Sequence, residues 1–265
     1  MKIKSLHLYP VKSLAGISVD RFELDDFGPR GDRRWVIVDE ANRFVTQRQL
    51  PLLAKVKTEL DDDLVRVSFP GGGSFLLEPD GGLQDVVVWR DQVAGRVGAS
   101  EASAALSRYC GQALRFVYMP EDSFRRVDPE RVPEQRRVSF ADGFPLLVTT
   151  QSSLAELNSR LESPVDMRRF RPNIVVEGCA PWAEDGWRSL AVGDVSFEVV
   201  KPCSRCVMTT VDPDSGLKHP GTQPLKTLAG YRRTPEGVIF GQNAIHQSHG
   251  VIRVRDHVTA IYQEN

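Results

Sequence analysis

Short β-prone segments separated by glycine, proline and aspartate turns run through this chain, and they limit the possible folds more than any other feature. Turns such as PGGG (70–73) and PDGG (79–82) are typical of antiparallel sheets. Strands and helices do not alternate, which argues against a doubly wound parallel sheet. The sequence therefore predicts a mixed, β-rich fold of barrel-like or sandwich type. We predict strands over residues 3–11, 17–24, 33–39, 42–49, 85–89, 171–178, 192–203, 237–243, 250–258 and 259–262.

Three segments carry helical signals. Residues 100–111 place apolar side chains at helical spacing, with Ser100 as a candidate cap and a glycine at the end. Residues 152–162 are amphipathic, and Ser153 with Glu156 has the spacing of a capping box. Residues 224–233 begin with a proline, which suits the first turn of a helix. We therefore expect a few helices beside many strands.

The charge balance excludes some classes of partner. Lys and Arg number 34 against 35 Asp and Glu, which gives a net charge of −1. No bulk field therefore attracts nucleic acid or an anionic membrane. No apolar stretch approaches 18 residues, and the N-terminus lacks the apolar run of a signal peptide. We expect no nucleic-acid or membrane partner and a cytoplasmic location, where the four cysteines stay reduced.

The run KPCSRC (201–206) is the densest chemical signal. It holds Cys203 and Cys206, with Arg205 beside the second thiol. Cationic neighbours favour the thiolate form of cysteine, which is the form that binds metals. A zinc site would need about two more Cys or His ligands. A thioredoxin-like pair would open a helix, whereas VMTTVDP continues as a β-prone run. In a third interpretation, one thiolate binds a soft metal that belongs to a cofactor. This needs only one cysteine and anion-binding residues around it.

Candidate anion-binding side chains stand at the ends of predicted strands. Lys12 and Ser13 lie in YPVKSLAG (9–16), Arg33 lies in GDRRW (31–35), and Arg171 and Asn173 lie in FRPN (170–173). Lysine, arginine, serine and asparagine hold a phosphate by charge and by hydrogen bonds. Their joint occurrence at strand boundaries raises the expectation of a phosphate site.

An ordered series of motifs adds a family resemblance. YPVKSLAG, GDRRWVIVD, FVTQRQLP, FRPNIVVEG, AEDGW, CSRCVMTTVDPDSG, PLKTL and FGQN together resemble MOSC-domain proteins with an N-terminal β-barrel companion domain. This is the family of the mitochondrial amidoxime-reducing component and its bacterial relatives. The resemblance covers nearly the whole chain. It implies an N-terminal MOSC-associated β-barrel domain over residues 1–120 and a MOSC β-barrel domain with a few helices over residues 121–265.

The resemblance also implies a site. The expected cofactor is the molybdenum cofactor in its molybdopterin form, with Cys206 as the catalytic cysteine and the protein ligand to molybdenum. Cys203 matches a position that does not bind the metal, so we expect it to serve packing. Asp142, in FADGFP, matches a cofactor-facing loop, although the glycine and phenylalanine after it depart from that loop's polar pattern. The residues expected to bind the cofactor are Lys12, Ser13, Arg33, Asp142, Arg171, Asn173, Ser204, Arg205 and Cys206, and all of them except Asp142 and Cys206 are expected to hold its phosphate and pterin.

The resemblance implies an activity as well. We expect a molybdenum-dependent oxidoreductase that reduces small N-hydroxylated compounds, namely hydroxylamines, amidoximes or N-hydroxylated bases, as in detoxification. The cysteines have no cluster-binding spacing, so electrons are expected from a separate ferredoxin-like, flavin or haem protein. MOSC domains also occur fused to cofactor sulfurases, and a carrier of cofactor or sulfur without its own turnover is therefore the second hypothesis.

Overall fold

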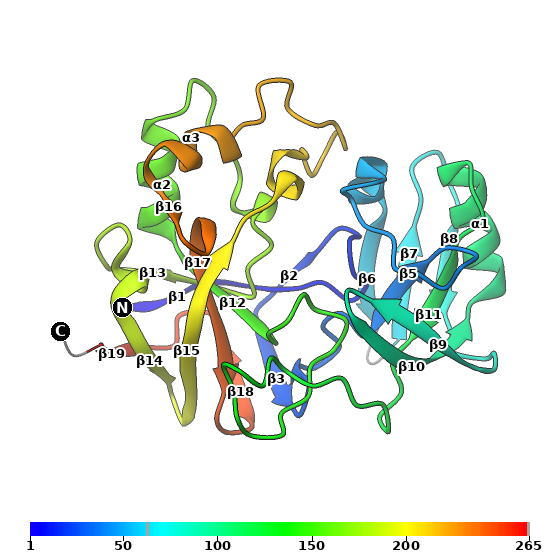
Figure 1. Cartoon of the computed structure of the whole chain (residues 1–265), viewed down its shortest axis with the longest axis horizontal. Coiled ribbons are helices and arrows are strands. Elements are labelled where there is room, and N and C mark those ends of the chain that lie inside the picture. The colour runs from blue at the N-terminus through cyan, green and yellow to red at the C-terminus, as the bar shows by residue number, and fades with distance from the viewer. Residues whose placement is uncertain (62–63, 264–265) are drawn as a thin grey trace.

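The structure, a computed structural model, describes residues 1–61 and 64–263. Strands dominate it, which confirms the predicted β-rich class. Figure 1 shows two lobes side by side, one built on a large sheet and the other on smaller sheets. In the described residues the large sheet has nine strands, in the order β19 (Val258–Tyr262), β14 (Trp187–Val192), β15 (Val195–Ser204), β17 (Gly237–His246), β12 (Leu146–Thr150), β13 (Ile174–Glu177), β1 (Lys2–Leu8) and β2 (Ile17–Val19), with β16 (Arg233–Thr234) paired to β17.

The remaining strands of the described residues lie in smaller sheets. One has the order β5 (Trp35–Val38), β11 (Arg115–Tyr118), β10 (Asp91–Gly98) and β9 (Leu83–Val88). A second has β18 (Gly250–Arg253), β3 (Arg21–Asp25) and β4 (Gly28–Pro29). A third has β6 (Lys57–Asp61), β7 (Leu64–Ser68) and β8 (Ser74–Leu77).

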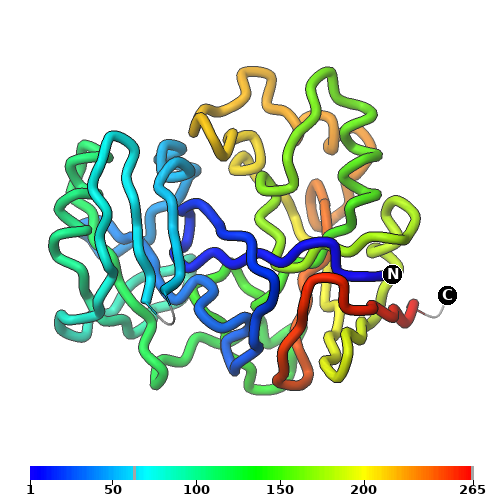
Figure 2. The backbone as a smooth tube through the Cα atoms, turned by 180° about the vertical axis from the view of Figure 1, so that it is seen from behind, coloured from blue at the N-terminus to red at the C-terminus, as the bar shows by residue number. Residues whose placement is uncertain are grey.

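The first strands of the chain pair with strands of its C-terminal half. Strand β1 lies antiparallel to β13, with Leu6 opposite Ile174. Strand β3 lies antiparallel to β18, with Phe22 opposite Ile252. Figure 2 shows the blue N-terminal segment crossing from one lobe to the other beside later segments. The two halves therefore share sheets, and the domain boundary at residue 120 stays a prediction.

The helices form where they were predicted, but their first residues differ. Helix α1 (Ser100–Cys110) begins after Ala99, so Ser100 is not its cap. Helix α2 (Gln151–Ser159) begins after Thr150, whose side chain accepts a hydrogen bond from the Ser153 amide. The predicted capping box at Ser153 is therefore wrong. Helix α3 (Leu225–Tyr231) follows a proline, as predicted. Short 3-10 helices are η1 (Pro51–Lys55), η2 (Met167–Arg169), η3 (Ala183–Gly186) and η4 (Val207–Thr210).

The predicted strand over residues 42–49 is wrong. Only isolated bridges form there, from Arg43 and Phe44. The next residues turn, because the Thr46 hydroxyl donates to Gln49 Oε1 at 2.6 Å. Gln47 Nε2 donates to the Ser13 carbonyl at 2.7 Å, which ties this loop to the first turn of the chain. One local and one long-range side-chain hydrogen bond thus take the place of the backbone hydrogen bonds of a β-strand, which the β-propensity of this segment favours.

Two separate apolar clusters support the lobes. One lies on the nine-stranded sheet and includes Leu6, Val148 and Trp187. The other lies under α1 and includes Ile37 and Phe116. Burial of each such side chain contributes about 1.5–3 kcal/mol. The polar residues described below lie between these clusters. No helix in the described residues is both long enough and apolar enough to cross a membrane.

Acid is expected to weaken the fold through His246, in β17. This side chain is 1% exposed, and its Nε2 lies 3.3 Å from Arg136 Nη2. Within the part of the chain that the structure describes, its Nδ1 has no hydrogen-bond partner. Burial, aided by the Arg136 charge, lowers the pKa of His246 from 6.5 to about 4. Protonation therefore favours the unfolded chain. The stability from neutral His246 is complete above pH 6.5 and falls by up to about 3 kcal/mol as the pH drops towards 4.

Urea unfolding at several pH values measures this loss. We expect His246→Gln to reduce the decrease in unfolding free energy between pH 6.5 and pH 4. His257→Gln, at an exposed position, serves as the matched control and should follow the wild type. Parallel pH profiles for the wild type and His246→Gln would contradict this account.

Candidate cofactor site

Sheet topology explains how distant predicted residues meet. Strand β13 runs parallel to β12 and antiparallel to β1, so β12 and β13 begin at the edge where β1 ends. Lys12 follows β1, Asp142 precedes β12, and Arg171 precedes β13. Arg33 joins them because its amide donates to the Tyr9 carbonyl at 2.8 Å. Residues at equivalent ends of neighbouring strands are brought together without being close in sequence.

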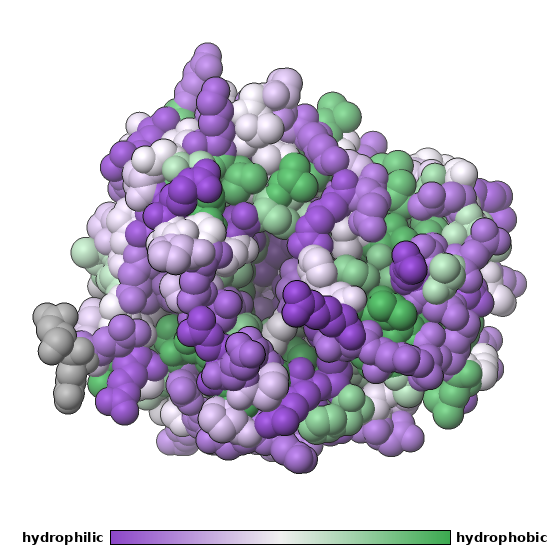
Figure 3. All heavy atoms as spheres, in the orientation of Figure 1, coloured by the Kyte–Doolittle hydropathy of each residue, from purple (hydrophilic) through white to green (hydrophobic). Residues whose placement is uncertain are grey.

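All nine residues predicted for the site line one cleft. Strand β15 ends at Ser204, and η4 begins after Cys206, so these elements carry the cysteine to the cleft. The cleft encloses about 840 Å³, a volume that includes space open to solvent. Figure 3 shows the hollow between the two lobes. Its lining, within the described chain, includes six cationic side chains and one carboxylate: Lys12, Arg33, Arg48, Arg169, Arg171, Arg205 and Asp142.

Arg33 is held by a buried polar network. Its Nη1 donates to Asp32 and, at 3.1 Å, to Asn173 Oδ1, while Nη2 donates to the Arg171 carbonyl at 3.2 Å. Asp32 also accepts from the Tyr9 amide and from Asn173 Nδ2. The Asn173 amide is thus fully engaged inside the protein, since its Oδ1 also accepts from a β12 amide. Asn173 lines the cleft, but its side chain orients Arg33 instead of presenting free donors.

Tyr9 supports two of the arginines. The guanidinium carbons of Arg33 and Arg171 lie 4.3 Å and 4.2 Å from its ring centre. The Tyr9 hydroxyl donates to the Pro172 carbonyl at 3.1 Å, and burial raises the pKa of this phenol to about 12. The phenol therefore stays neutral, and its ring interacts favourably with both cations. A buried aromatic ring thus fixes two positive charges at one wall of the cleft.

Several buried donors in the cleft lack partners. Ser13 Oγ, Arg171 Nη2 and Arg205 Nε are buried and have no hydrogen-bond partner among the described residues. Ser13, Arg33 and Arg171 also have positive φ angles of 72°, 49° and 56°. Unpaired buried polar atoms and left-handed backbone at non-glycine residues both cost free energy and are concentrated at functional sites. An anion with several acceptor oxygens, such as a phosphate, would satisfy these donors, so the residues fit the cofactor that the motifs imply.

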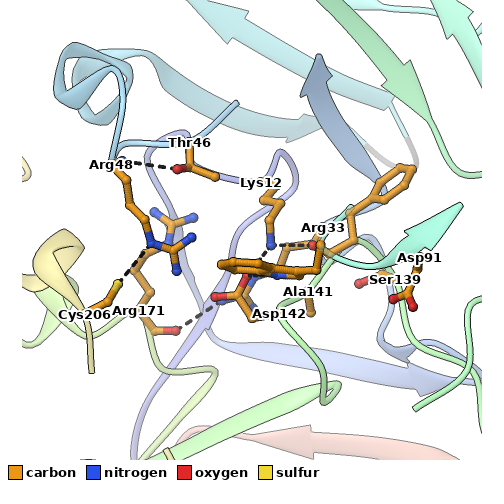
Figure 4. A network of polar contacts seen from close by, with 12 residues as sticks. Lys12, Arg33, Thr46, Arg48, Asp91, Ser139, Ala141, Asp142, Arg171 and Cys206 are labelled. Carbon is orange, nitrogen blue, oxygen red and sulfur yellow. Dashed lines mark hydrogen bonds and ion pairs between the residues drawn. The ribbon is translucent and has the colours of Figure 1, made fainter. Parts of the chain in front are cut away.

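Cys206 contacts an arginine from the opposite lobe. Arg48 Nε lies 3.3 Å from Cys206 Sγ and donates to it. The Arg48 amide donates to Thr46 Oγ1 at 3.2 Å, and Lys218 Nζ donates to the Arg48 carbonyl at 3.0 Å. Figure 4 shows Arg48 reaching across to the sulfur from the loop that carries Thr46. The thiol therefore has a positively charged donor beside it in a half-buried position.

Lys12 and Asp142 form an ion pair at the other side of the cleft. Lys12 Nζ donates to Asp142 Oδ1 and, at 2.8 Å, to the Phe140 carbonyl. Burial lowers the pKa of Lys12 to about 8, and the ion pair with Asp142 opposes that effect. Figure 4 shows both side chains facing the site. Asp142 thus holds the lysine charge in place at neutral pH.

The cleft lining also includes three polar residues that were not predicted from the sequence, namely Thr46, Arg48 and Arg169. Arg48 lies in FVTQRQLP, a motif quoted for the resemblance but misread as a strand. Arg169 Nη2 pairs with Asp212 at 2.9 Å and Nη1 donates to the Thr210 carbonyl. The only signal for Arg48 was its motif, because the atom it contacts lies 158 positions later.

Other cysteines have modest roles in this structure. Cys203 lines the cleft and accepts a hydrogen bond from Arg205 Nη1 at 2.9 Å, so it orients an arginine in addition to packing. Cys110 is half-buried, and burial raises the pKa of its thiol to about 11. Cys179 is half-buried near the Ser152 hydroxyl. The described residues contain no group of three or more His, Cys, Asp or Glu placed to hold a metal ion.

Comparison with known proteins adds the family. A model described as "MOSC N-terminal beta barrel domain" matches residues 1–113, and one described as "MOSC domain" matches residues 135–259. Human Mitochondrial amidoxime-reducing component 1 is 34% identical, over 98% of this chain and 83% of its own length. Bovine Mitochondrial amidoxime reducing component 2 is 35% identical, over 87% of this chain and 72% of its own length.

A much longer protein also matches this chain. Rice Molybdenum cofactor sulfurase is 30% identical over 90% of this chain, which spans only 32% of that protein. The two models together cover most of the chain, and both amidoxime-reducing components match over most of their own length. The chain therefore belongs to the family of MOSC-domain proteins that carry the MOSC N-terminal β-barrel domain.

Proposed function

We propose that this protein is a molybdenum-cofactor-dependent oxidoreductase that reduces N-hydroxylated compounds. One observation carries the proposal: Cys206 lies in a cleft whose lining is rich in lysine and arginine from both lobes and contains buried donors without partners. A thiolate suits a soft metal, and the cations suit the phosphate of a pterin cofactor. The relatives named amidoxime-reducing components agree with this activity.

Each residue has a proposed role. Cys206 would supply the single protein ligand to molybdenum, as its position in CSRC implies. Lys12, Ser13, Arg171 and Arg205 would bind the phosphate and pterin directly. Asn173 would act through Arg33, because its own amide is engaged inside the protein. Asp142 would orient Lys12. The Ser204 hydroxyl donates to the Glu236 carbonyl, so it would meet the cofactor as an acceptor.

The cofactor, when bound, would supply the two-electron redox chemistry. The overall reaction breaks the N–O bond, consumes two electrons and two protons, and releases the amine or amidine and water. The protein's part is to keep the thiolate in place, offset the negative charge of the cofactor and leave the cleft open to small substrates. We propose that electrons arrive from a separate redox protein and that the protein acts in the cytoplasm.

Analysis of purified protein tests the proposal. Molybdenum is measured by mass spectrometry and pterin by fluorescence, and reduced methyl viologen serves as the electron donor for benzamidoxime reduction. Stoichiometric molybdenum and pterin with substrate-dependent dye oxidation are the expected result. Stoichiometric zinc without pterin would contradict it.

A carrier of cofactor or sulfur is the second candidate. The similarity to rice Molybdenum cofactor sulfurase favours it, because that match covers 90% of this chain. The same preparation separates the two candidates. Molybdenum and pterin without turnover under several reduced dyes would support the carrier, and turnover would exclude it as the sole role.

Cofactor binding is expected to weaken as pH rises through about 8. Lys12 in the free protein loses its charge there, and an uncharged amine attracts a phosphate much less. Pterin retained after gel filtration between pH 7 and pH 9.5 measures the effect. Lys12→Arg keeps its charge over this range and should flatten the profile. An unchanged profile in Lys12→Arg would rule out Lys12 as the titrating group.

A further inference from the structure

Trp89 occupies an unfavourable position for a tryptophan. Because Val88 pairs with Asp91, only Trp89 and Arg90 connect β9 to β10. Trp89 has a φ angle of 59°, and its side chain is 44% exposed. Two-residue hairpin turns favour asparagine, aspartate or glycine at positive φ. Neither the backbone nor burial explains this residue, and such strain is commonly retained for function.

The Trp89 ring is held by contacts to Asp142 and Arg48, which line the cleft. Its Nε1 donates to Asp142 Oδ1 at 3.3 Å. Its ring centre lies 5.0 Å from that of Phe44 and 4.5 Å from Arg48 Cζ. Both Asp142 and Arg48 line the cleft. The indole is therefore held in one orientation although much of its surface remains exposed.

Arg48 connects this ring to the reactive centre. The same guanidinium that lies over Trp89 donates through Nε to Cys206 Sγ. Only one side chain therefore separates the indole from the sulfur. The partly exposed indole therefore stands next to Asp142 and Arg48, two residues that line the cleft leading to Cys206.

We propose that Trp89 determines specificity by stacking on flat, conjugated N-hydroxylated substrates. This inference rests on the proposed function. An indole surface attracts flat π-systems, whereas a saturated ring of the same size gains less from the contact. Trp89 would thus favour aromatic amidoximes and N-hydroxylated bases over aliphatic analogues that carry the same reacting group.

Matched substrates test the proposal. The wild type, Trp89→Phe and Trp89→Ala are assayed with benzamidoxime and cyclohexanecarboxamidoxime, which differ in the flatness of the ring. We expect Trp89→Ala to lower the ratio of the two kcat/KM values by about 5- to 30-fold, while Trp89→Phe keeps most of it. Leu83→Ala, at the exposed first residue of β9, is the control and should leave the ratio unchanged. Equal losses for both substrates in Trp89→Ala would overturn the proposal and make Trp89 a brace for Arg48.

A binding measurement separates this inference from the proposed function. Calorimetry compares benzamidine with cyclohexanecarboxamidine, which carry the same charge and need no reduction. We expect Trp89→Ala to weaken benzamidine binding about 5- to 30-fold and cyclohexanecarboxamidine binding much less. A protein that shows this preference without turnover would support Trp89 and contradict the oxidoreductase. Equal weakening of both ligands, or of neither, would overturn the role of Trp89.

Discussion

Serine in place of Cys206 is expected to remove molybdenum from the protein and to lower the reduction of N-hydroxylated substrates by at least about 100-fold. A serine hydroxyl is a hard, protonated donor at neutral pH and is a poor ligand for a soft metal. Removing a group that only orients a metal ligand already costs about 10–100-fold in metal affinity or activity, so loss of the ligand itself should cost more. Molybdenum content and dye-coupled turnover measure the two effects. Pterin should be retained in part, because the arginines and Lys12 remain.

Cys203→Ser provides the matched control. Cys203 accepts a hydrogen bond from Arg205 Nη1, and a serine oxygen can accept the same bond. We therefore expect this variant to keep its molybdenum and most of its turnover. Equal loss of metal in Cys203→Ser and Cys206→Ser would show that the ligand is assigned wrongly or that the two thiols act as a redox pair.

Methionine in place of Arg171 is expected to separate cofactor binding from stability. The Arg171 guanidinium is buried beside Tyr9, and burial lowers its pKa to about 10. Its Nη2 has no hydrogen-bond partner in residues 1–61 and 64–263. Without an anion, this buried cation stabilises the fold little, so the unfolding free energy of cofactor-free protein should stay within about 2 kcal/mol of the wild type or rise. Cofactor affinity should fall by about 10- to 100-fold, because a charge-assisted hydrogen bond is lost.

Urea unfolding of cofactor-free protein and pterin retention measure these two quantities. Arg168→Met is the matched control, since Arg168 is a nearby exposed arginine paired with Asp214. That variant should change neither quantity much. If Arg171→Met lost several kcal/mol of stability and still retained pterin, Arg171 would serve as a structural link to the Leu14 carbonyl, which its Nη1 contacts at 2.6 Å.

Local patterns predicted the parts of this protein that depend on local physics. Helix α1 was predicted over 100–111 and spans Ser100–Cys110, because apolar spacing and a terminal glycine act within a few residues. The run Asp-Pro-Asp-Ser-Gly (212–216) forms a turn by the same kind of local contact, because the Asp212 carboxylate accepts from the amides of Asp214 and Ser215. The nine candidate site residues were predicted from motifs that resemble a family, and the structure brings all nine to one cleft.

Long-range contacts account for what the sequence did not predict. The loop over residues 42–49 has strand-like composition, yet Gln47 bonds to Ser13 and Arg48 reaches Cys206. The engagement of Asn173 inside the protein depends on Arg33 and Asp32, both about 140 positions earlier. No local pattern encodes which side chains meet across such distances. The pairing of β1 with β13 was missed for the same reason.

The pairing of β1 with β13 also determines the order in which parts of the chain can fold during synthesis. During synthesis the segment that carries Lys12 and Ser13 leaves the ribosome with β1 unpaired, and β3 waits for β18 near the other end of the chain. Exposed strand edges invite association with other chains, and closing such long loops costs entropy. The cleft can therefore form only after the strands as far as β17, which carries its lining residue Asn243, have been made, and the proposed cofactor could bind only then.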